Sequence, residues 1–456
     1  MPRHFNRSGL LAISAAALLL SACSGSVGGG NPAAALPLVQ HRQHHQYETK
    51  INHVVVIIQE NRSFDNLFQG YPGANTQSYG YNAQNQVITL QPVGLETKWD
   101  LPHTAHTFFL SCNGTGSIPG TNCQMNGFDG EGWGCGGPGE PTCPNANPPY
   151  SYVPQSETQP YFDMANQYVL ADEMFASNLD ESSFVAHQFL IAAQSSSAVN
   201  YPLSRWGCEG GSADTIQTLT QQRTIGSPIV ACFNNNTLGA ELDNASLSWK
   251  FYASPVNGNQ GIWSAYQAIK PIYTGPDWKK DVINPQKRFL IDVKTKLADV
   301  TWIVPTCQNS DHAGCGANTG PSWVASLVNA IGESKFWSST AIFVVWDDPG
   351  GWYDHVAPTM LDYDGLGFRV PLLIISPYAK QGYVSHVNYE LGSILKFIEN
   401  RWGLAPMSAS DTRATSPEGD AFDFTQSPRQ FTPIGSAHDI NYFLHQPPDL
   451  RPPDTE

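Results

Sequence analysis

The chain has little positive charge for its length. Its 456 residues contain 24 Lys and Arg against 39 Asp and Glu, a formal net charge of −15. The first 22 residues hold two of the basic residues and none of the acidic ones, so the remainder has 22 basic and 39 acidic residues, a net charge of −17. No local basic cluster compensates. Since an acidic surface repels phosphate backbones, we expect no nucleic-acid partner.

Long apolar runs are also scarce. The main one, Leu10 to Leu20, follows two arginines, is too short to span a bilayer comfortably, and leads into Ser21-Ala22-Cys23. We interpret residues 1–22 as a signal peptide. The spacing resembles a bacterial lipoprotein box, whose cysteine becomes the lipidated first residue; an ordinary signal peptide is the alternative. Residues 23–48 would then be a lipidated tether. We expect an exported protein, either an outer-membrane lipoprotein or a periplasmic or extracellular protein, with membrane contact only through this lipid.

The sequence lacks any Cys-x-x-Cys pair, which argues against a metal cluster. Once Cys23 is set aside, eight cysteines remain, and they fall as neighbours along the chain. An even number of locally clustered cysteines in an exported protein predicts up to four disulfides that close short loops. Pairing by proximity joins Cys112 to Cys123, Cys135 to Cys143, Cys208 to Cys232, and Cys307 to Cys315.

Internal repeats are absent, and strand-like runs alternate with helix-like stretches. This alternation predicts an α/β fold with a doubly wound, mostly parallel sheet. The expected strands are His53–Ile58, Tyr168–Phe175, Trp249–Ala253, Thr301–Pro305, Ala341–Trp346 and Pro371–Ser376, and the expected helices are Tyr161–Gln167, Phe184–Gln194, Ser322–Glu333 and Tyr389–Trp402. The length allows one large domain with insertions or two domains. Residues 111–150 would be a Cys- and Gly-rich, disulfide-pinned insertion. Residues 405–456 would be an irregular tail.

Two of the apolar runs end in oxygen-bearing side chains. Glu60 and Asn61 follow the first expected strand, and Asp347 and Asp348 follow a much later one. In a parallel sheet the carboxyl ends of the strands border one crevice, so these four side chains can converge there. Two adjacent acids repel each other unless a cation or hydrogen-bond donors offset them. The pattern predicts a bound cation, although Glu60-Asn61 alone fits a turn or helix cap equally well.

Histidines lie near the same inferred sheet edge. They are His103, His106, His312 and His355, the last two directly after Asp311 and Asp354. A lone histidine is more often structural than catalytic. Imidazolium donors beside a metal would, however, suit an anionic ligand, as phosphoester chemistry requires.

Two serines open the helix-like stretch that begins at Phe184. A serine at the position of Ser182 or Ser183 ordinarily caps the helix by accepting an amide hydrogen bond. The same position favours bound anions, and a metal beside the hydroxyl would make it a nucleophile. The residues by themselves leave both interpretations, and both serines, open.

Four ordered motifs point to a family. They are Glu60-Asn61-Arg62-Ser63-Phe64-Asp65 with Gly70, Ser310-Asp311-His312, Gly320-Pro321-Ser322-Trp323-Val324, and Trp346-Asp347-Asp348-Pro349-Gly350-Gly351-Trp352-Tyr353-Asp354-His355-Val356. Together they resemble the bacterial phosphoesterase family that contains phosphatidylcholine-type phospholipases C and a metal-dependent acid phosphatase. The resemblance implies an alkaline-phosphatase-like α/β/α sandwich, with residues 49–404 as the catalytic domain. It also implies one divalent metal ion, whose identity (Ca, Mg, Mn or Zn) it leaves open.

Roles for individual residues follow from the resemblance by position. Glu60, Asn61, Asp347, Asp348 and Ser183 would be metal ligands, with Ser183 also the nucleophile, His312 and Asp311 catalytic, and His103, His106 and His355 in the phosphate pocket. Ser182 stands where relatives often have proline. The expected activity is hydrolysis of a phosphoester, phospholipase C-like on phospholipid or related phosphodiesters. Acid phosphatase activity on phosphomonoesters is one alternative. A non-catalytic surface lipoprotein with structural calcium is a second, because calcium prefers oxygen ligands.

Overall fold

The computed structural model of the chain describes residues 50–254 and 262–452. The expected signal peptide and tether therefore lie outside the described residues. Within this part of the chain, none of the helices combines the length and the apolar character needed to cross a bilayer.

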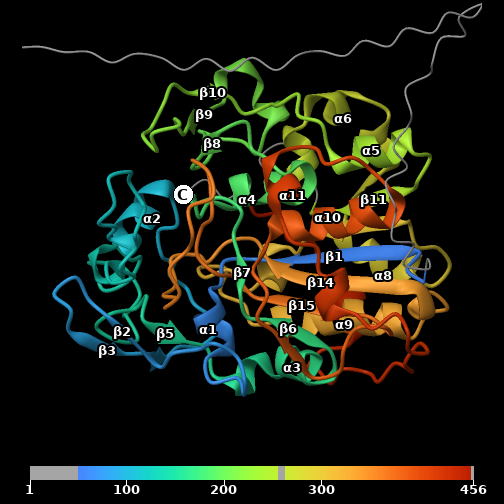
Figure 1. Cartoon of the computed structure of the whole chain (residues 1–456), viewed down its shortest axis with the longest axis horizontal. Helices are drawn as coiled ribbons and strands as arrows, with labels where there is room; N and C mark the ends of the chain where they lie inside the picture. Colours follow the sequence, from blue (N-terminus) through green and yellow to red (C-terminus); the bar gives the residue numbers. More distant parts are fainter. Residues whose placement is uncertain (1–49, 255–261, 453–456) are drawn as a thin grey trace, which may run out of the picture. The chain divides into compact units, whose positions relative to one another are not determined.

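A central sheet of eight strands organises the domain (Figure 1). The strand order is β12-β11-β13-β1-β14-β15-β6-β16. The strands are β1 (His53–Gln59), β6 (Val169–Ala171), β11 (Trp249–Tyr252), β12 (Val282–Ile283), β13 (Val300–Ile303), β14 (Thr340–Trp346), β15 (Leu372–Ile375) and β16 (Tyr383–Ser385). Every pairing in this sheet is parallel except those of β15 with β14 and β6. The prediction of a mostly parallel sheet is confirmed.

The two central strands are the apolar runs that end in acidic residues. β1 and β14 pair in parallel over seven residues, from His53 opposite Thr340 to Gln59 opposite Trp346. Residues 54–58 of β1 and all of β14 are buried, as expected for β-branched strands covered on both faces. Because the pairing is parallel and in register, both strands end at the same level.

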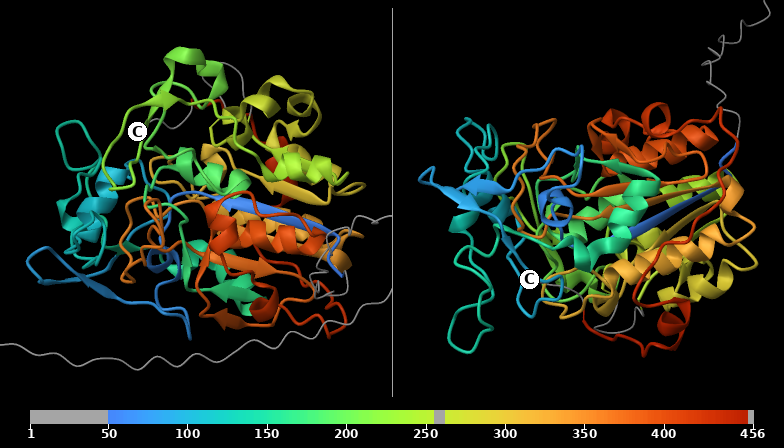
Figure 2. Two further views of the ribbon diagram at one scale, coloured as in Figure 1. Left: turned by 45° about the horizontal axis from the view of Figure 1, so that its top comes forward. Right: turned by 90° about the horizontal axis from the view of Figure 1, so that it is seen from below.

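Helices cover both faces of the sheet. α3 (Gln155–Gln167) packs against α9 (Gly320–Gly332), while α4 (Ser183–Ala192) packs against α10 (Leu391–Trp402). Figure 2, right, shows α10 and α9 on opposite sides of the sheet. The three layers form the predicted α/β/α sandwich. All ten residues of α4 are buried, so this helix lies inside the layer rather than on its surface.

One predicted strand is divided. The run Tyr168–Phe175 forms β6 and the separate β7 (Met174–Phe175), which pairs with β17 (Tyr389–Glu390) outside the central sheet. Asp172, between the two strands, is fully buried and accepts a hydrogen bond from the backbone N–H of Asn75, 2.7 Å away. The chain turns away from the sheet at this carboxylate. The short strands β12 and β16 give no comparable apolar signal and were not predicted.

Smaller elements complete the domain. They are α1 (Phe64–Phe68), β2 (Tyr79–Tyr81), β3 (Val87–Thr89), β4 (Gln91–Pro92), α2 (Ala105–Cys112), β5 (Ser151–Tyr152), β8 (Ala198–Val199), β9 (Thr215–Thr218), β10 (Ile229–Val230) and α5 (Leu238–Asn244). Further along the chain lie α6 (Lys270–Thr274), α7 (Asp277–Lys280), α8 (Phe289–Asp292), α11 (Ala409–Arg413), α12 (Glu418–Ala421) and α13 (Ile440–His445). The last three are short helices joined by irregular segments within the predicted tail.

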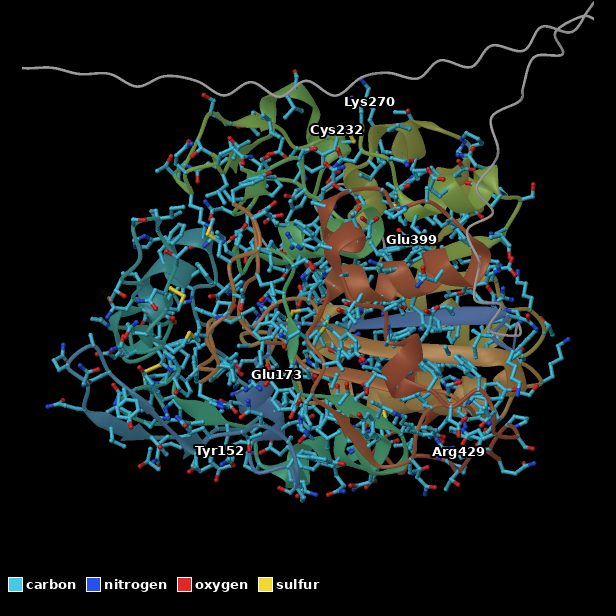
Figure 3. The ribbon with its side chains drawn as sticks, in the orientation of Figure 1. Tyr152, Glu173, Cys232, Lys270, Glu399 and Arg429 are labelled. Atoms are coloured by element: carbon cyan, nitrogen blue, oxygen red, sulfur yellow. A yellow bond between two sulfur atoms is a disulfide. The ribbon has the colours of Figure 1, made fainter. Side chains whose placement is uncertain are left out.

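The four disulfides form as predicted. They join Cys112 to Cys123, Cys135 to Cys143, Cys208 to Cys232, and Cys307 to Cys315 (Figure 3). Two of them lie in the insertion at residues 111–150, which is irregular apart from the end of α2 and one short 3-10 turn. Disulfides of this kind suit an oxidising compartment.

Candidate active site

The carboxyl ends of β1 and β14 bring four predicted residues together. The backbone N–H of Asn61 donates to Asp347 Oδ1, 3.1 Å away, and the N–H of Asp347 donates to the carbonyl of Gln59. Glu60, Asn61, Asp347 and Asp348 are all fully buried. The convergence that parallel pairing predicts is therefore present.

The backbone at Asn61 and Gly350 allows the segments after β1 and β14 to pack closely. Asn61 adopts a left-handed conformation with φ 56°, which asparagine tolerates better than most residues. Gly350 has φ 61°, and a Cβ placed on it would come within 2.6 Å of the Asn61 Cβ. Its N–H donates to Asp348 Oδ1 at 2.8 Å. Glycine is required here because the turn after Asp348 lies directly on Asn61.

Ser183 reaches the same cluster from a third element. It is the first residue of α4, and its Oγ lies 3.1 Å from Asp348 Oδ2 and 3.2 Å from Asn61 Oδ1. The hydroxyl thus lies among the predicted metal ligands, within hydrogen-bond distance of two oxygen atoms.

Ser182 faces elsewhere. Its hydroxyl lies 2.7 Å from the carbonyl of Asn200 and 3.1 Å from Asp180 Oδ2. It occupies the N-cap position of α4, but its side chain accepts no capping hydrogen bond there. Of the two serines, the geometry favours Ser183 as the reactive one.

His187 is a site residue that the sequence patterns did not bring to attention. Its Nε2 lies 3.2 Å from Glu60 Oε1 and 3.3 Å from Asp347 Oδ2, and the whole side chain is buried. It follows Ser183 by four residues, so both side chains project from one face of α4. That spacing within the predicted helix was the available signal.

Charge in this cluster is strongly unbalanced. The carboxyl groups of Glu60, Asp347 and Asp348 are buried next to one another, and the imidazole of His187 contacts the first two. Burial and the neighbouring carboxylates of Asp347 and Glu60 raise the pKa of Asp348 well above its ordinary value. Burial alone would also raise the pKa of Asp347, but its hydrogen bond to His187 and the charge of that ring lower it to about 2.

Two of the four predicted histidines lie together beside the cluster. The rings of His103 and His312 have centroids 5.5 Å apart, and the His312 ring stacks on Trp263 at 5.6 Å. The segment carrying His103 is close to the carboxylates, because a Cβ on Gly351 would come within 2.8 Å of Leu101 Cβ and the Pro102 carbonyl. The two rings therefore lie on a segment next to the carboxylates, and their roles in binding phosphate and in catalysis stay predictions.

The acidic partner of His312 is Asp100 rather than Asp311. Nδ1 of His312 lies 3.6 Å from Asp100 Oδ2. The Asp311 carboxylate instead accepts hydrogen bonds from Tyr161, at 2.8 Å, and from the Trp346 indole, at 3.0 Å. Asp311 and His312 are adjacent in sequence, but their side chains contact different groups. Asp311 is thus held by Tyr161 and Trp346, and its predicted catalytic role stays a prediction.

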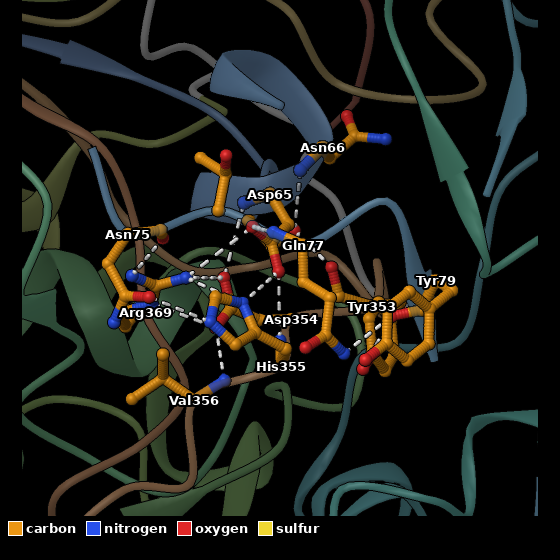
Figure 4. A network of polar contacts seen from close by, with 12 residues as sticks. Asp65, Asn66, Asn75, Gln77, Tyr79, Tyr353, Asp354, His355, Val356 and Arg369 are labelled. Atoms are coloured by element: carbon orange, nitrogen blue, oxygen red, sulfur yellow. Dashed lines mark hydrogen bonds and ion pairs between the residues drawn. The ribbon is translucent and has the colours of Figure 1, made fainter. Parts of the chain in front are cut away.

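His106 and His355 lie apart from the pair. His106 is exposed on α2, after the N-cap residue Thr104. His355 belongs to a separate polar network (Figure 4), in which its Nδ1 lies 2.6 Å from Asp65 Oδ2 and its Nε2 lies 3.0 Å from Asn75 Oδ1. Both ring nitrogens of His355 are thus engaged within the protein, and the structure does not bring it to the other predicted pocket residues.

The same network connects the segments that follow β1 and β14. Asp65 follows the Glu60-Asn61 segment, and Asp354 follows the Asp347-Asp348 segment; Arg369 pairs with Asp354 at 2.8 Å and lies 3.6 Å from Asp65. The buried guanidinium supplies the positive charge between these carboxylates. The network therefore fits a structural role better than that of a metal site.

Two groups of side chains at the strand ends have geometry suited to a cation. Glu60, His187 and Asp347 form one, and Asp100, His103 and His312 form the other; within each, the candidate ligand atoms lie within 4.8 Å of one another. The first group adjoins Asn61, Asp348 and Ser183. It is the stronger candidate because its carboxylates are fully buried and adjoin three further oxygen-bearing side chains.

Comparison with solved structures finds similarity to a protein in the alkaline phosphatase superfamily from Vibrio parahaemolyticus. It has 10% sequence identity and a TM-score of 0.36, over 82% of this chain and 72% of that one. The lipoteichoic acid synthase LtaP from Listeria monocytogenes gives 8% identity and a TM-score of 0.35, over 80% of this chain and 76% of its own.

Two phospholipases C are similar to this chain in sequence. Phospholipase C A of Mycobacterium tuberculosis is 26% identical over 447 residues, covering 84% of this chain and 79% of the relative. The non-hemolytic phospholipase C of Pseudomonas aeruginosa is also 26% identical, covering 83% of this chain and 58% of its own length. The model of the Phosphoesterase family matches residues 51–405. The chain therefore belongs to the Phosphoesterase family and is a phosphoester hydrolase.

Proposed function

We propose that the protein is a metal-dependent phosphoester hydrolase with Ser183 as its nucleophile, acting like a phospholipase C on phospholipid or related phosphodiesters. The observation that carries the proposal is the position of Ser183 Oγ, 3.1 Å from Asp348 Oδ2 and 3.2 Å from Asn61 Oδ1, among three buried carboxyl groups.

The residues of the cluster fit a divalent cation. Three buried carboxyl groups with one imidazole carry negative charge that is costly to bury unless a cation offsets it. Carboxylate, amide and hydroxyl oxygens from Glu60, Asn61, Asp347, Asp348 and Ser183 would hold the ion. His187 holds Glu60 and Asp347 in a fixed orientation through Nε2. When bound, a divalent ion supplies charge neutralisation for a phosphoryl oxygen and lowers the pKa of an adjacent hydroxyl.

Ser183 then attacks phosphorus. Asp348 Oδ2, 3.1 Å from Oγ, accepts the hydroxyl proton. A bond forms between Oγ and phosphorus while the bond from phosphorus to the leaving oxygen breaks, and the result is a phosphoryl ester on Ser183. His103 and His312 face the transferred group as hydrogen-bond donors, and His312 gives a proton to the leaving oxygen. Asp100 Oδ2, 3.6 Å from His312 Nδ1, helps to orient the ring. Water then attacks phosphorus and gives a proton to His312, the bond from phosphorus to Oγ breaks, and Oγ regains its proton from Asp348 as the phosphorylated product leaves.

The similarity to phospholipases C favours a phosphodiester substrate. The predicted signal peptide at residues 1–22 and the four disulfides support export to an oxidising compartment, and a lipid on Cys23 would hold the enzyme at a phospholipid surface. Phosphomonoester hydrolysis requires the same site residues, so the choice of substrate rests on the relatives.

Parallel assays of two chromogenic substrates test the proposal. The purified protein is assayed on p-nitrophenyl phosphorylcholine and on p-nitrophenyl phosphate, before chelation, after chelation and after divalent ions are restored. We expect faster release from the phosphorylcholine diester, loss of that activity with the metal, and recovery on restoration. A preference for the monoester would reassign the enzyme as a phosphatase. Full activity in a protein shown to contain no metal would reject the metal-dependent mechanism.

A further inference from the structure

A segment near the end of the described chain binds the loop that carries His312. We name residues 446–451, which follow α13, the strap, and residues 307–315, which the Cys307–Cys315 disulfide closes, the His312 loop. The strap lies outside residues 51–405, which the family model matches. Its contacts with the loop are therefore additional to the features that place the chain in its family.

Contacts between strap and loop are specific and polar. The backbone N–H of Gln308 donates to Asp449 Oδ2 at 2.9 Å, and Asn309 Nδ2 donates to Gln446 Oε1 at 2.8 Å. Arg451 Nη1 donates to the carbonyl of Cys315 at 2.7 Å and also contacts Cys307 Sγ. Arg451 therefore reaches both cysteines of the loop, while the other two strap residues hold the segment just before Ser310.

The opposite side of the loop is tied to the proposed metal site. Gln59, directly before Glu60, donates from Nε2 to the Asn309 carbonyl at 3.1 Å and accepts the N–H of Asp311 at Oε1, 3.0 Å away. The His312 loop is thus held between the end of β1 and the strap. Its position relative to Ser183 depends on both attachments.

The strap is itself anchored to the domain. Lys287 Nζ donates to the carbonyls of Leu444 and Gln446 at 3.1 and 2.7 Å, and the buried Phe443 packs on Trp323 at a ring distance of 5.2 Å. The Asp449 side chain is only 8% exposed. Because the strap is anchored and the Asp449 carboxylate is shielded from solvent, the strap can restrain the His312 loop. A strap without these anchors would move together with the loop.

We propose that Gln446, Asp449 and Arg451 are positioning residues that hold His312 in register with the nucleophile. The inference rests on the proposed role of His312 in phosphoryl transfer. A reacting group displaced by about 1 Å can cost two orders of magnitude in rate. Loss of the strap contacts therefore lowers the rate of the chemical step and leaves the metal ligands, on β1, β14 and α4, in place.

Single substitutions in the strap test this directly. Asp449→Ala and Arg451→Ala are compared with Arg429→Ala, which removes hydrogen bonds to the carbonyls of Gln167, at 3.0 Å, and Ala379, at 2.8 Å. Arg429 also lies beyond residue 405 (Figure 3), and these hydrogen bonds lead to segments other than the His312 loop. It is more buried than Arg451, so its loss is at least as disruptive to packing.

Hydrolysis of p-nitrophenyl phosphorylcholine gives the primary readout. We expect kcat of Asp449→Ala and Arg451→Ala to fall by about 5- to 50-fold with KM within about twofold, metal content unchanged and a loss of Tm no larger than that of Arg429→Ala. Arg451→Lys, which keeps one donor, should recover part of kcat. A kcat within twofold of wild type in both strap variants would overturn the proposal, as would an equal fall in kcat for Arg429→Ala.

A double-mutant cycle separates this proposal from the role of His312. If the strap acts through His312, Arg451→Ala should cause no further loss of kcat in a His312→Ala background. Additive losses would show that the strap acts by another route and reject the proposal. An unchanged kcat in His312→Ala alone would instead refute the proposed role of His312 in phosphoryl transfer, and the strap proposal would fall with it. A loss in His312→Ala without any loss in the strap variants would reject the strap alone.

Discussion

The imidazole of His187 links the two strand ends of the site, with Nε2 3.2 Å from Glu60 Oε1 and 3.3 Å from Asp347 Oδ2. Glu60 follows β1 and Asp347 follows β14, whereas His187 comes from the buried helix α4. One side chain therefore orients two proposed ligands from separate segments. The same helix face presents Ser183, so nucleophile and carboxylates are held by one rigid element.

Replacing His187 should weaken metal binding. Loss of a group that orients two ligands typically lowers metal affinity by about 10- to 100-fold, so we expect His187→Ala to need that much more metal for half-maximal activity. Metal content after dialysis against a chelator series measures this. His53→Ala is the matched control, because His53 lies at the other end of β1 and contacts the Ala298 carbonyl. Equal metal retention in both variants would contradict the assignment.

Gly350 should be intolerant of any side chain. Its φ is 61°, and an added Cβ would lie only 2.6 Å from the Asn61 Cβ, so Gly350→Ala must displace this proposed ligand. We expect a stability loss of about 1–3 kcal/mol and a loss of metal-dependent activity. Gly419→Ala is the control, because a Cβ there meets no atom within 4 Å. Chemical denaturation and hydrolysis assays on both variants measure these losses. If Gly350→Ala were as stable and as active as Gly419→Ala, the close packing of Gly350 against Asn61 would be wrong.

His103 and His106 should differ sharply. His103 lies beside His312 in the pocket, so His103→Ala should lower kcat/KM by about 100-fold. His106 is exposed on α2, and His106→Ala should leave kcat/KM within about twofold of wild type. Steady-state kinetics on the two variants measure this difference in kcat/KM. A large loss in His106→Ala would mean that the pocket includes α2 in the working enzyme.

Stability should fall with rising pH because of one buried acid. Burial, together with a hydrogen bond and charge from Asp411, raises the pKa of Glu399 from 4.5 to about 9 (Figure 3). Between these values the folded state keeps a proton that the unfolded chain has lost, so the free energy of unfolding decreases as pH rises. Glu399→Gln removes this dependence and should be more stable than wild type by at least about 1 kcal/mol at pH 8, with little difference near pH 4.

Denaturant titrations at both pH values measure this effect. Glu333→Gln, at an exposed acid after α9, is the control. Its free energy of unfolding should differ from that of wild type by the same amount at both pH values. A difference between Glu399→Gln and wild type that does not grow with pH would show that Glu399 is ionised in the folded protein at neutral pH.

The convergence of Glu60, Asn61, Asp347 and Asp348 was predictable because it depends on strand pairing. Buried apolar runs identify β1 and β14, and parallel registration carries their ends to one edge. Disulfides between sequence neighbours were predictable for a similar reason, since a short loop leaves few partners. These features depend on local sequence and one simple topological rule.

Other parts of the site depend on packing that one sequence does not reveal. His103 precedes the N-cap Thr104 and His106 follows it, so the two histidines do not share a helix face. The side chains of adjacent residues can contact different groups. Asp311 accepts hydrogen bonds from Tyr161 and Trp346, whereas His312 lies next to Asp100. His355 hydrogen-bonds to Asp65 and Asn75 instead of lying with the other predicted pocket residues. Only the fold places these two residues beside it.

Trapping the covalent intermediate is the decisive experiment for Ser183. The enzyme is quenched in acid during turnover of p-nitrophenyl phosphorylcholine and digested, and the peptides are mapped by mass spectrometry. We expect a phosphorylcholine ester on Ser183 in wild type, present only with metal and absent from Ser183→Ala but retained in Ser182→Ala. A label on Ser182, or steady turnover by Ser183→Ala at the wild-type rate, would contradict the proposed mechanism.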